Sequence, residues 1–371
     1  MNSDVLALKD RVPLRVVALI GSLFGFFVGL DMMGLSFKLF GSGFAEVLIE
    51  RTSNPFVGLI IGILATTLVQ SSSTTTSLTV GLVAAGALSI EGAVPIVMGA
   101  NIGTSVTCVL VSLVHVRRKE EFQRAFAGAT IHDFFNVLAV MILLPLEVMT
   151  GFLAKTAGYL QSALEGVGGM KLLDPLKMVV RPVGEWISEF LGQSGVLVLI
   201  VGIALLIASL KFLVDSLKFL MTGRAEQILH RTLFRSAIAS MAAGTVITAM
   251  VQSSSITTSL MIPLVGAGVV TLEQVFPFTI GANIGTTITA ILAALSTGNP
   301  AAVTVAFTHL LFNLSGALLI YVPPPIRKIP LALARALGKL GSERRVLAVV
   351  CILAFFYGLP VLLLFLSGAL G

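Results

Sequence analysis

The feature that most constrains the fold of this chain is a succession of apolar segments, each long enough to cross the roughly 30 Å hydrocarbon core of a bilayer as a helix. Charged residues make up only 11% of the chain, whereas soluble domains carry about 25%. The sequence therefore predicts an all-α, polytopic membrane protein, not a soluble enzyme or a nucleic-acid-binding protein. Cys108 and Cys351 lie inside apolar segments, so we expect two small buried hydrophobes and no disulfide.

Two dense clusters of hydroxyl and amide side chains interrupt this apolar pattern. The run Gln-Ser-Ser-Ser starts at Gln70 inside the segment Phe56–Leu88, and the same run starts at Gln252 inside Ala237–Val270. Unsatisfied polar groups are expensive within hydrocarbon. Two matching clusters predict broken or re-entrant helices that meet at one central binding site.

The two clusters belong to a longer internal repeat. Aligning Gln70 with Gln252 pairs Thr66–Leu110 with Thr248–Leu292 without a gap, and about half of the positions are identical. A repeat of this length in a membrane protein is typical of secondary transporters, whose substrates bind between the two repeated halves.

The repeat contains a second polar string, Gly-Ala-Asn-Ile-Gly-Thr, at Gly99–Thr104 and again at Gly281–Thr286. We expect each copy to break its apolar segment as the serine clusters do. Further along the chain, His132–Asn136 resembles His309–Asn313, so the repeat extends into the following span.

The charges of matching loops predict the orientation of the halves. The loop Gly41–Pro55 has a net charge of −1, and its counterpart Met221–Arg235 has +2. The loop Arg117–Arg124 has +2, and its counterpart Thr297–Ala301 has none. Because basic loops stay in the cytoplasm, the two repeats are predicted to be inverted relative to each other.

These observations divide the chain into four parts. Residues 1–147 are expected to form the first transmembrane repeat, and 148–194 an extracytoplasmic connector. Residues 195–325 form the second repeat, and 326–371 hold a cytoplasmic amphipathic helix followed by a final transmembrane helix. The last span would leave the C-terminus outside.

The chemistry of the clusters favours a small oxyanion bound together with hard cations. No Lys or Arg lies between Pro55 and Leu110 or between Ser236 and Leu295. Hydroxyls and helix N-termini bind oxyanions, and the same hydroxyl and carboxamide oxygens suit hard cations. Neutral donors alone hold a divalent anion poorly, so bound cations would supply the missing charge, and each ion would raise the affinity for the other.

Asp133 is the most informative single residue. It lies within the predicted span Ala125–Glu147, and the matching position in the second half is Leu310. An intramembrane carboxylate is a functional candidate by default. We expect Asp133 to bind a cation with Asn136, one turn along on the same face, and to set the charge moved in each cycle.

Simpler interpretations remain open for several of these residues. Isolated Ser and Thr side chains in spans often bond only to their own helix. The Gly-Ala-Asn-Ile-Gly-Thr strings could serve helix packing alone, and Asp133 could be a structural hydrogen-bonding residue. His132 and His309 are expected to pack or to support other ligands. No catalytic triad, zinc site or carboxylate pair stands out, so neither an enzyme nor an organic cofactor is expected.

Several long strings resemble the type II sodium-dependent phosphate cotransporters. The matching strings are Val69–Ser73, Ile96–Thr107, Arg124–Asn136, Leu143–Glu147, Phe312–Gly316 and Ala334–Gly338. The resemblance implies uptake of inorganic phosphate driven by sodium, with both ions held by the two Gln-Ser-Ser-Ser segments. It also implies that an aspartate at the position of Asp133 is associated with an additional sodium site and with electrogenic transport of divalent phosphate.

The resemblance and the site chemistry together define the candidate ligands. The candidate phosphate-binding residues are Gln70, Ser71, Ser72, Ser73, Gln252, Ser253, Ser254, Ser255, Asn101 and Asn283. The candidate sodium-binding residues are Asp133, Asn136, Thr75, Thr104, Thr258, Thr286 and Asn313. Sodium is the only metal expected.

Two departures from the animal pattern matter. The compact connector has no cysteine, which looks like a bacterial member. His115 and Arg118 stand where animal relatives carry Gln and Asp, which puts an ion-binding role at these two positions in doubt.

The sequence therefore predicts a sodium-coupled importer of inorganic phosphate in the cytoplasmic membrane, acting as a monomer or a homodimer. The alternatives are a sodium-coupled carrier of another oxyanion and an uncoupled anion channel. The sodium stoichiometry, and the choice between an elevator and a rocking motion, stay open at this point.

Overall fold

The structure is a computed structural model that describes residues 3–166, 174–221 and 236–367. All regular structure in these ranges is helical, and seven of the described helices are long and apolar enough to cross a membrane. The prediction of an all-α, polytopic membrane protein is confirmed.

The described first half of the chain contains three candidate spans, Val16–Phe40, Ile90–His115 and Lys119–Thr150, and one broken helix pair. Its helices are α1 (Ser3–Phe40), α2 (Ser42–Arg51), α3 (Pro55–Val69), α4 (Ser72–Ala84), α5 (Ile90–Gly103), α6 (Val106–Ser112) and α7 (Lys119–Thr150). The first Gln-Ser-Ser-Ser cluster separates α3 from α4, as predicted. Two connector helices follow, α8 (Phe152–Gly166) and α9 (Asp174–Phe190).

The second half repeats much of this order. Its helices are α10 (Gly195–Met221), α12 (Ala237–Val251), α13 (Ser254–Ser259), α14 (Met261–Gly266), α15 (Leu272–Thr297) and α16 (Pro300–Gly316). The chain ends with α17 (Pro324–Glu343), α18 (Arg345–Leu353) and α19 (Leu359–Leu366), and a π-helical segment joins the last two into one span.

The prediction of a break at the Gly-Ala-Asn-Ile-Gly-Thr strings is wrong for the second copy, because α15 runs unbroken through Gly281–Thr286. In the first copy the helix is interrupted at Thr104, the last residue of the string, and at Ser105. The glycines serve close packing instead. A Cβ atom on Gly281 would lie 1.9 Å from Met241 O in α12, and one on Gly99 would lie 2.0 Å from Leu59 O in α3.

These contacts explain why α3 packs along α5 and α12 along α15. Because glycine has no side chain, the backbones of the paired helices can approach closely. Close packing holds helices together in a bilayer, where no hydrophobic driving force acts between them. The helix pairs α3–α5 and α12–α15 are therefore the rigid frames that carry the two serine clusters.

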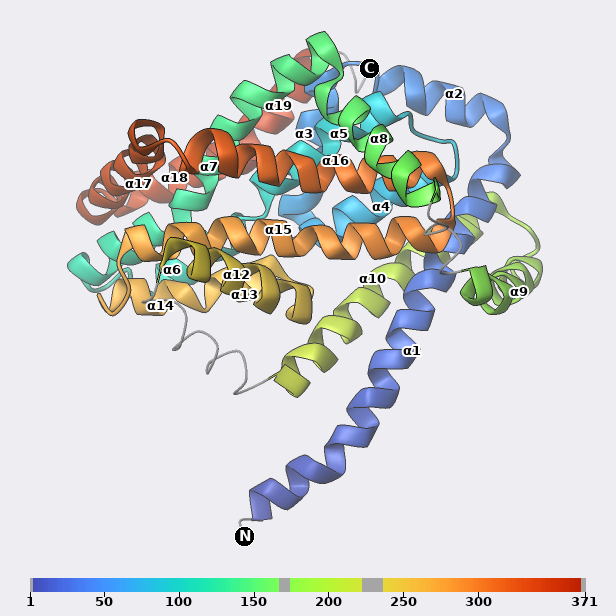
Figure 1. Cartoon of the computed structure of the whole chain (residues 1–371), viewed down its shortest axis with the longest axis horizontal. Helices are drawn as coiled ribbons and strands as arrows, with labels where there is room; N and C mark the ends of the chain where they lie inside the picture. The colour runs from blue at the N-terminus through green and yellow to red at the C-terminus, as the bar shows by residue number, and fades with distance from the viewer. Residues whose placement is uncertain (1–2, 167–173, 222–235, 368–371) are drawn as a thin grey trace.

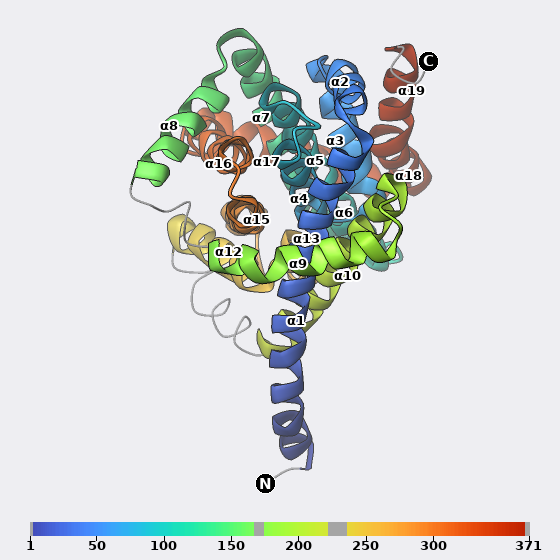
Figure 2. The same ribbon diagram turned by 90° about the vertical axis from the view of Figure 1, so that its right-hand side faces the viewer.

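The peripheral helices lie at the ends of the molecule. Figure 1 shows α17 at one end and α9 at the other, and Figure 2 shows α9 crossing α1 at a steep angle. The amphipathic α17 buries Leu331, Ala334 and Gly338 and packs against α7. Cys351, in the outward-facing last span, is exposed, which corrects the expectation that both cysteines are buried. Cys108 is buried.

Candidate functional site

The two serine clusters adopt the same local structure. Gln70 (φ 55°) and Gln252 (φ 57°) are both left-handed residues that end their helices. The next residue, Ser71 or Ser253, is extended and caps the following helix, accepting from Thr74 N at 3.2 Å or from Ile256 N at 3.4 Å. A left-handed conformation strains a residue other than glycine by about 1–3 kcal/mol, and such strain tends to gather at functional sites.

The two breaks meet in the centre of the molecule. Ser73 Oγ donates to Gln252 O at 3.4 Å, across 179 positions of the chain. Cys108 Sγ, just beyond the first repeat's Gly-Ala-Asn-Ile-Gly-Thr string, lies 3.0 Å from Thr258 Oγ1 in α13. The expected proximity of the two halves is therefore present in the structure.

Several serine hydroxyls where the two breaks meet are free to bind a ligand. Ser72, Ser254 and Ser255 are buried, and among the described residues their hydroxyls make no hydrogen bond. The first turn of a helix also presents backbone N–H groups that no helical carbonyl reaches. Hydroxyls and amides from opposed helix starts can surround a tetrahedral anion with neutral donors.

The two glutamines are not equivalent. Gln70 is exposed, and no hydrogen bond involves its side chain among the described residues. Gln252 is buried, with its Oε1 accepting from Thr289 Oγ1 at 2.6 Å and its Nε2 donating to Ala249 O. As the structure stands, Gln252 supports its own break, and Gln70 is free to contact a ligand.

The candidate asparagines form a network between the halves. His132 Nε2 lies 2.8 Å from Asn283 Oδ1, Asn283 Nδ2 donates to Asn136 Oδ1 at 2.9 Å, and Asn136 Nδ2 donates to Asn101 O at 2.7 Å. Asn101 Nδ2 donates to Val97 O of its own helix. The structure thus brings two phosphate candidates and one sodium candidate into contact, Asn283 and Asn136 through their side-chain amides and Asn101 through its backbone carbonyl.

The threonine candidates keep lone pairs available for a cation. Thr104, Thr258 and Thr286 donate to carbonyls one turn back in their own helices, at 2.7–3.0 Å. Thr75 donates to Ser71 O and accepts from Thr66 Oγ1. A hydroxyl that donates its proton to the backbone still offers an oxygen to sodium.

Asp133 and Asn313 lie buried with unpaired oxygens. Asp133 is 8% exposed, and its Oδ1 has no hydrogen-bond partner in the described part of the chain. Asn313 Oδ1 also has none, although its Nδ2 donates to His309 O. A buried carboxylate without a partner requires a bound cation or a proton, so this geometry supports Asp133 as a cation ligand.

Cavities lie at both ends of α15. One, of about 260 Å³, is lined by Asp31, Lys38, Arg181 and the last turn of α15. The other, of about 340 Å³, is lined by Arg124, Arg335 and the first turn of α15. A hydrogen bond to Glu185 raises the pKa of Arg181, which keeps that guanidinium charged. Each cavity is lined by acidic as well as basic side chains, and Arg335 in the second is paired with Glu273.

Comparison with known proteins decides the family. A sequence model described as Na+/Pi-cotransporter matches residues 26–172 and 205–322. The chain belongs to the Na+/Pi-cotransporter family. The two matched blocks contain the two serine clusters and the asparagine network, and they leave α9 unmatched.

Curated relatives agree with this family. The chain is 35% identical over 445 residues to the rat sodium-dependent phosphate transport protein 2A, covering 99% of this chain and 70% of that protein. It is 32% identical over 450 residues to the human sodium-dependent phosphate transport protein 2B, with coverage of 95% and 65%. The chain therefore spans about two-thirds of the length of these relatives. No solved structure matches it.

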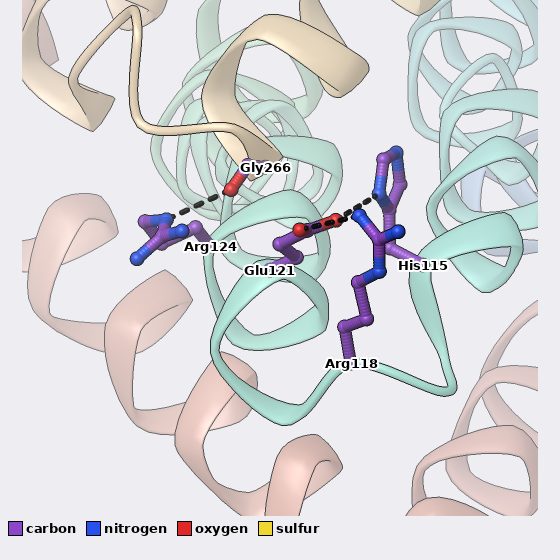
Figure 3. Close-up of polar contacts among 5 residues, drawn as sticks. All are labelled: His115, Arg118, Glu121, Arg124 and Gly266. Carbon is purple, nitrogen blue, oxygen red and sulfur yellow. Dashed lines mark hydrogen bonds and ion pairs between the residues drawn. The ribbon is translucent and has the colours of Figure 1, made fainter.

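His115 and Arg118, which were expected to depart from the Na+/Pi-cotransporter pattern, both contact the carboxylate of Glu121. Figure 3 shows the Glu121 carboxylate directed at both His115 and Arg118, with distances of 3.3 Å to His115 Nδ1 and 2.8 Å to Arg118 NH1. Nearby, Arg124 Nε donates to Gly266 O at the C-terminus of α14, where a cation is favourable. His115 and Arg118 thus hold the start of α7 in place.

Sequence reasoning missed the role of Thr289. His132 was expected to pack or to support other ligands, and its Nε2 lies 2.8 Å from the candidate phosphate ligand Asn283, as a supporting residue would. Thr289 was not singled out, yet its hydroxyl fixes Gln252. A signal was available, because Thr289 and Thr107 occupy matching positions of the internal repeat.

Proposed function

We propose that this chain imports inorganic phosphate, as divalent HPO₄²⁻, together with sodium ions. The observation that carries the proposal is the contact between the two serine-capped breaks, where Ser73 Oγ reaches Gln252 O. Opposed helix starts lined with hydroxyls fit a tetrahedral oxyanion. The names of the family and of the relatives, which specify sodium and phosphate, support this choice.

The charge of the site supports coupling to a cation. No Lys or Arg occurs between Pro55 and Leu110 or between Ser236 and Leu295, so the anion would face neutral donors alone. Sodium ions at Asp133, Asn136, Asn313 and the candidate threonines would balance its charge. Binding of either ion then raises the affinity for the other, which is thermodynamic coupling. More than two sodium ions per HPO₄²⁻ would make transport electrogenic.

We further propose that the two halves are inverted in the cytoplasmic membrane of a bacterium and that no organic cofactor is needed. The loop charges support the inversion. The matching conformations of Gln70 and Gln252 support a common structure for the two halves. A monomer holds both breaks, so the site is complete without a second copy.

The decisive experiment is uptake of labelled phosphate into proteoliposomes. With sodium outside and potassium inside, we expect phosphate to accumulate above its external concentration. With potassium or a large organic cation on both sides, only equilibration at background rate is expected. Downhill flux that is insensitive to sodium would instead indicate an anion channel.

Competition separates phosphate from other oxyanions. Arsenate has the same shape and charge, so it should inhibit labelled phosphate uptake, whereas sulfate should not at the same concentration. Inhibition by sulfate or by a dicarboxylate comparable to that by arsenate would favour a sodium-coupled carrier of another anion.

A further inference from the structure

The two copies of the internal repeat use matching residues differently. In the second copy, Thr289 Oγ1 donates to Gln252 Oε1 at 2.6 Å. The matching residues of the first copy are Thr107 and Gln70. Gln70 is exposed, and the buried hydroxyl of Thr107 has no hydrogen-bond partner within the described residues. A bond that the sequence allows in both copies is made in only one.

The histidine and asparagine residues show the same difference. His132 Nε2 lies 2.8 Å from Asn283 Oδ1, whereas both ring nitrogens of the matching His309 lack a partner in the described chain. Asn101, which matches Asn283, turns its amide to Val97 O of its own helix. His309 is 1% exposed, so the structure provides neither a protein partner nor open solvent for its ring.

The remaining matched bonds complete the pattern. Asn283 Nδ2 donates to Asn136 Oδ1, but Asn313 Oδ1, at the matching position, is buried and unpaired in the described chain. Thr66 Oγ1 donates to Thr75 Oγ1 at 2.9 Å, but the matching Thr248 hydroxyl is buried and unpaired. Each break therefore makes one of two possible bonds. The first break makes the bond between its two threonines, Thr66 and Thr75, and the second makes the bond between Gln252 and Thr289.

The result is that α15 makes both of these side-chain bonds, whereas its counterpart α5–α6 is joined to α7 through Asn101 O and to α13 through Cys108. The bonds of Asn283 and Thr289 fix α15 to α7 and to the second break. The counterpart segment α5–α6 makes neither of the matching bonds, and its helix is interrupted at Thr104 and Ser105. A buried polar group without a partner costs about 1–3 kcal/mol, so an arrangement that satisfies the unpaired groups is energetically accessible.

We propose that the transport cycle exchanges these bonds between the two copies. In the mirrored state Gln70 bonds Thr107, Asn101 bonds His309 and Asn313, and Thr248 bonds Thr257. In the same step the bonds of Gln252 to Thr289 and of Asn283 to His132 open. The inference rests on the proposed transport function, since it describes how the halves of that site alternate. These residues act as positioning residues and need not touch either ion.

The exchange gives the protein two states of similar free energy. Equivalent bonds break and form, so the difference between the states stays within the range that ions bound at the centre can bias. Alternation by inverted repeats usually moves one half against the other. Here α5–α6 would move together with α3, and α15 together with α12, because each pair is closely packed through its glycines.

Matched cysteine pairs test this exchange directly. In a background with Cys108→Ala and Cys351→Ala, one protein carries Gln252→Cys with Thr289→Cys, and the other carries Gln70→Cys with Thr107→Cys. A short bis-methanethiosulfonate reagent, whose spacer replaces the length lost from Gln, is added to membranes with and without sodium and phosphate. Mass spectrometry of the digested protein gives the fraction crosslinked, and each single-cysteine protein serves as its control.

We expect both pairs to crosslink and their yields to change in opposite directions when sodium and phosphate are added. Crosslinking of the second-copy pair alone would overturn the exchange, as would yields that rise and fall together. The presence of both crosslinks without added ions does not depend on the transported ion, whereas the response of the yields does. If both pairs crosslink but neither yield responds to phosphate, the exchange stands and the proposed cargo is wrong.

Isosteric substitutions provide a second test that does not require cysteine. Thr289→Val removes a bond of the state described here, and Thr107→Val removes one of the mirrored state. Loss of one hydrogen bond shifts a two-state ratio roughly fivefold. The apparent phosphate affinity should therefore move in opposite directions in the single variants and return toward the parent value in the double variant. Additive losses in the same direction would show that both threonines are merely structural.

Discussion

Ser73 is the residue whose hydroxyl joins the two breaks. It is 5% exposed, and its Oγ donates to Gln252 O, next to the serine hydroxyls that make no protein bond. We predict that Ser73→Ala raises the apparent KM for phosphate about five- to tenfold, the effect of one lost hydrogen bond. The control is Thr79→Val, because that hydroxyl donates only to Thr75 O within α4. Equal changes in both variants would remove Ser73 from the site.

Asp133 is the residue that should set the charge carried in each cycle. Its carboxylate is buried, and Oδ1 is unpaired among the described residues. Asp133→Asn keeps the shape and removes the charge, so we predict a change in the ratio of charge moved to phosphate taken up. Simultaneous recording of current and labelled uptake in proteoliposomes measures this ratio. An unchanged ratio with unchanged sodium dependence would contradict a cation-binding role.

At the scale of the element, helix pairs are held by glycines. A Cβ atom on Gly281 would lie 1.9 Å from the backbone oxygen of Met241, and no flexible side chain can yield there. Gly281→Ala should therefore destabilise the α12–α15 pair by about 1–3 kcal/mol, as overpacking does. Thermal unfolding in detergent measures the loss. Gly21→Ala is the matched control, because a Cβ atom there meets nothing within 4 Å. Equal unfolding temperatures for the two variants would argue against the packing role.

The helix α9 presents an apolar stripe that suits a lipid surface. Its exposed face carries Val179, Trp186 and Phe190, and the Trp186 ring stacks on Phe190 at a centroid distance of 6.2 Å. The charged pair Arg181–Glu185 lies beside this stripe. An amphipathic helix with aromatic residues typically lies in the membrane interface.

Trp186 is the only tryptophan in the sequence, so its fluorescence reports on α9 alone. In proteoliposomes we predict blue-shifted emission that lipids brominated near the headgroup quench more strongly than lipids brominated deep in the chain. Aqueous iodide should quench it weakly. Strong iodide quenching without lipid quenching would place α9 in water.

At the scale of the whole molecule, the loop charges predict which end faces the cytoplasm. Lys119 begins α7 and Lys155 lies in α8, and both side chains are exposed. The cysteine of Lys119→Cys should react with a membrane-impermeant maleimide only after the cells are permeabilised. A cysteine at Lys155→Cys should react in intact cells. The reverse pattern would invert the proposed topology.

The spans and the local structure of the two breaks follow from the residues of each segment alone. A serine that caps a helix accepts from a backbone N–H three residues ahead, so Ser71 and Ser253 carry the information for their own geometry. Apolar length likewise marks a span without reference to its neighbours. The family resemblance followed from the same strings, and the match to the Na+/Pi-cotransporter model confirms it.

The hydrogen bonds that matching residues make depend on how the helices pack. Gln70 and Gln252 have the same sequence neighbours and the same backbone conformation, yet only Gln252 is bonded to a threonine of the next span. The glycines of the second repeat's string pack α15 against α12 and do not break α15, against the sequence prediction. The physical reason is that a bond between helices depends on where the other helix lies, and two identical strings can face different surroundings.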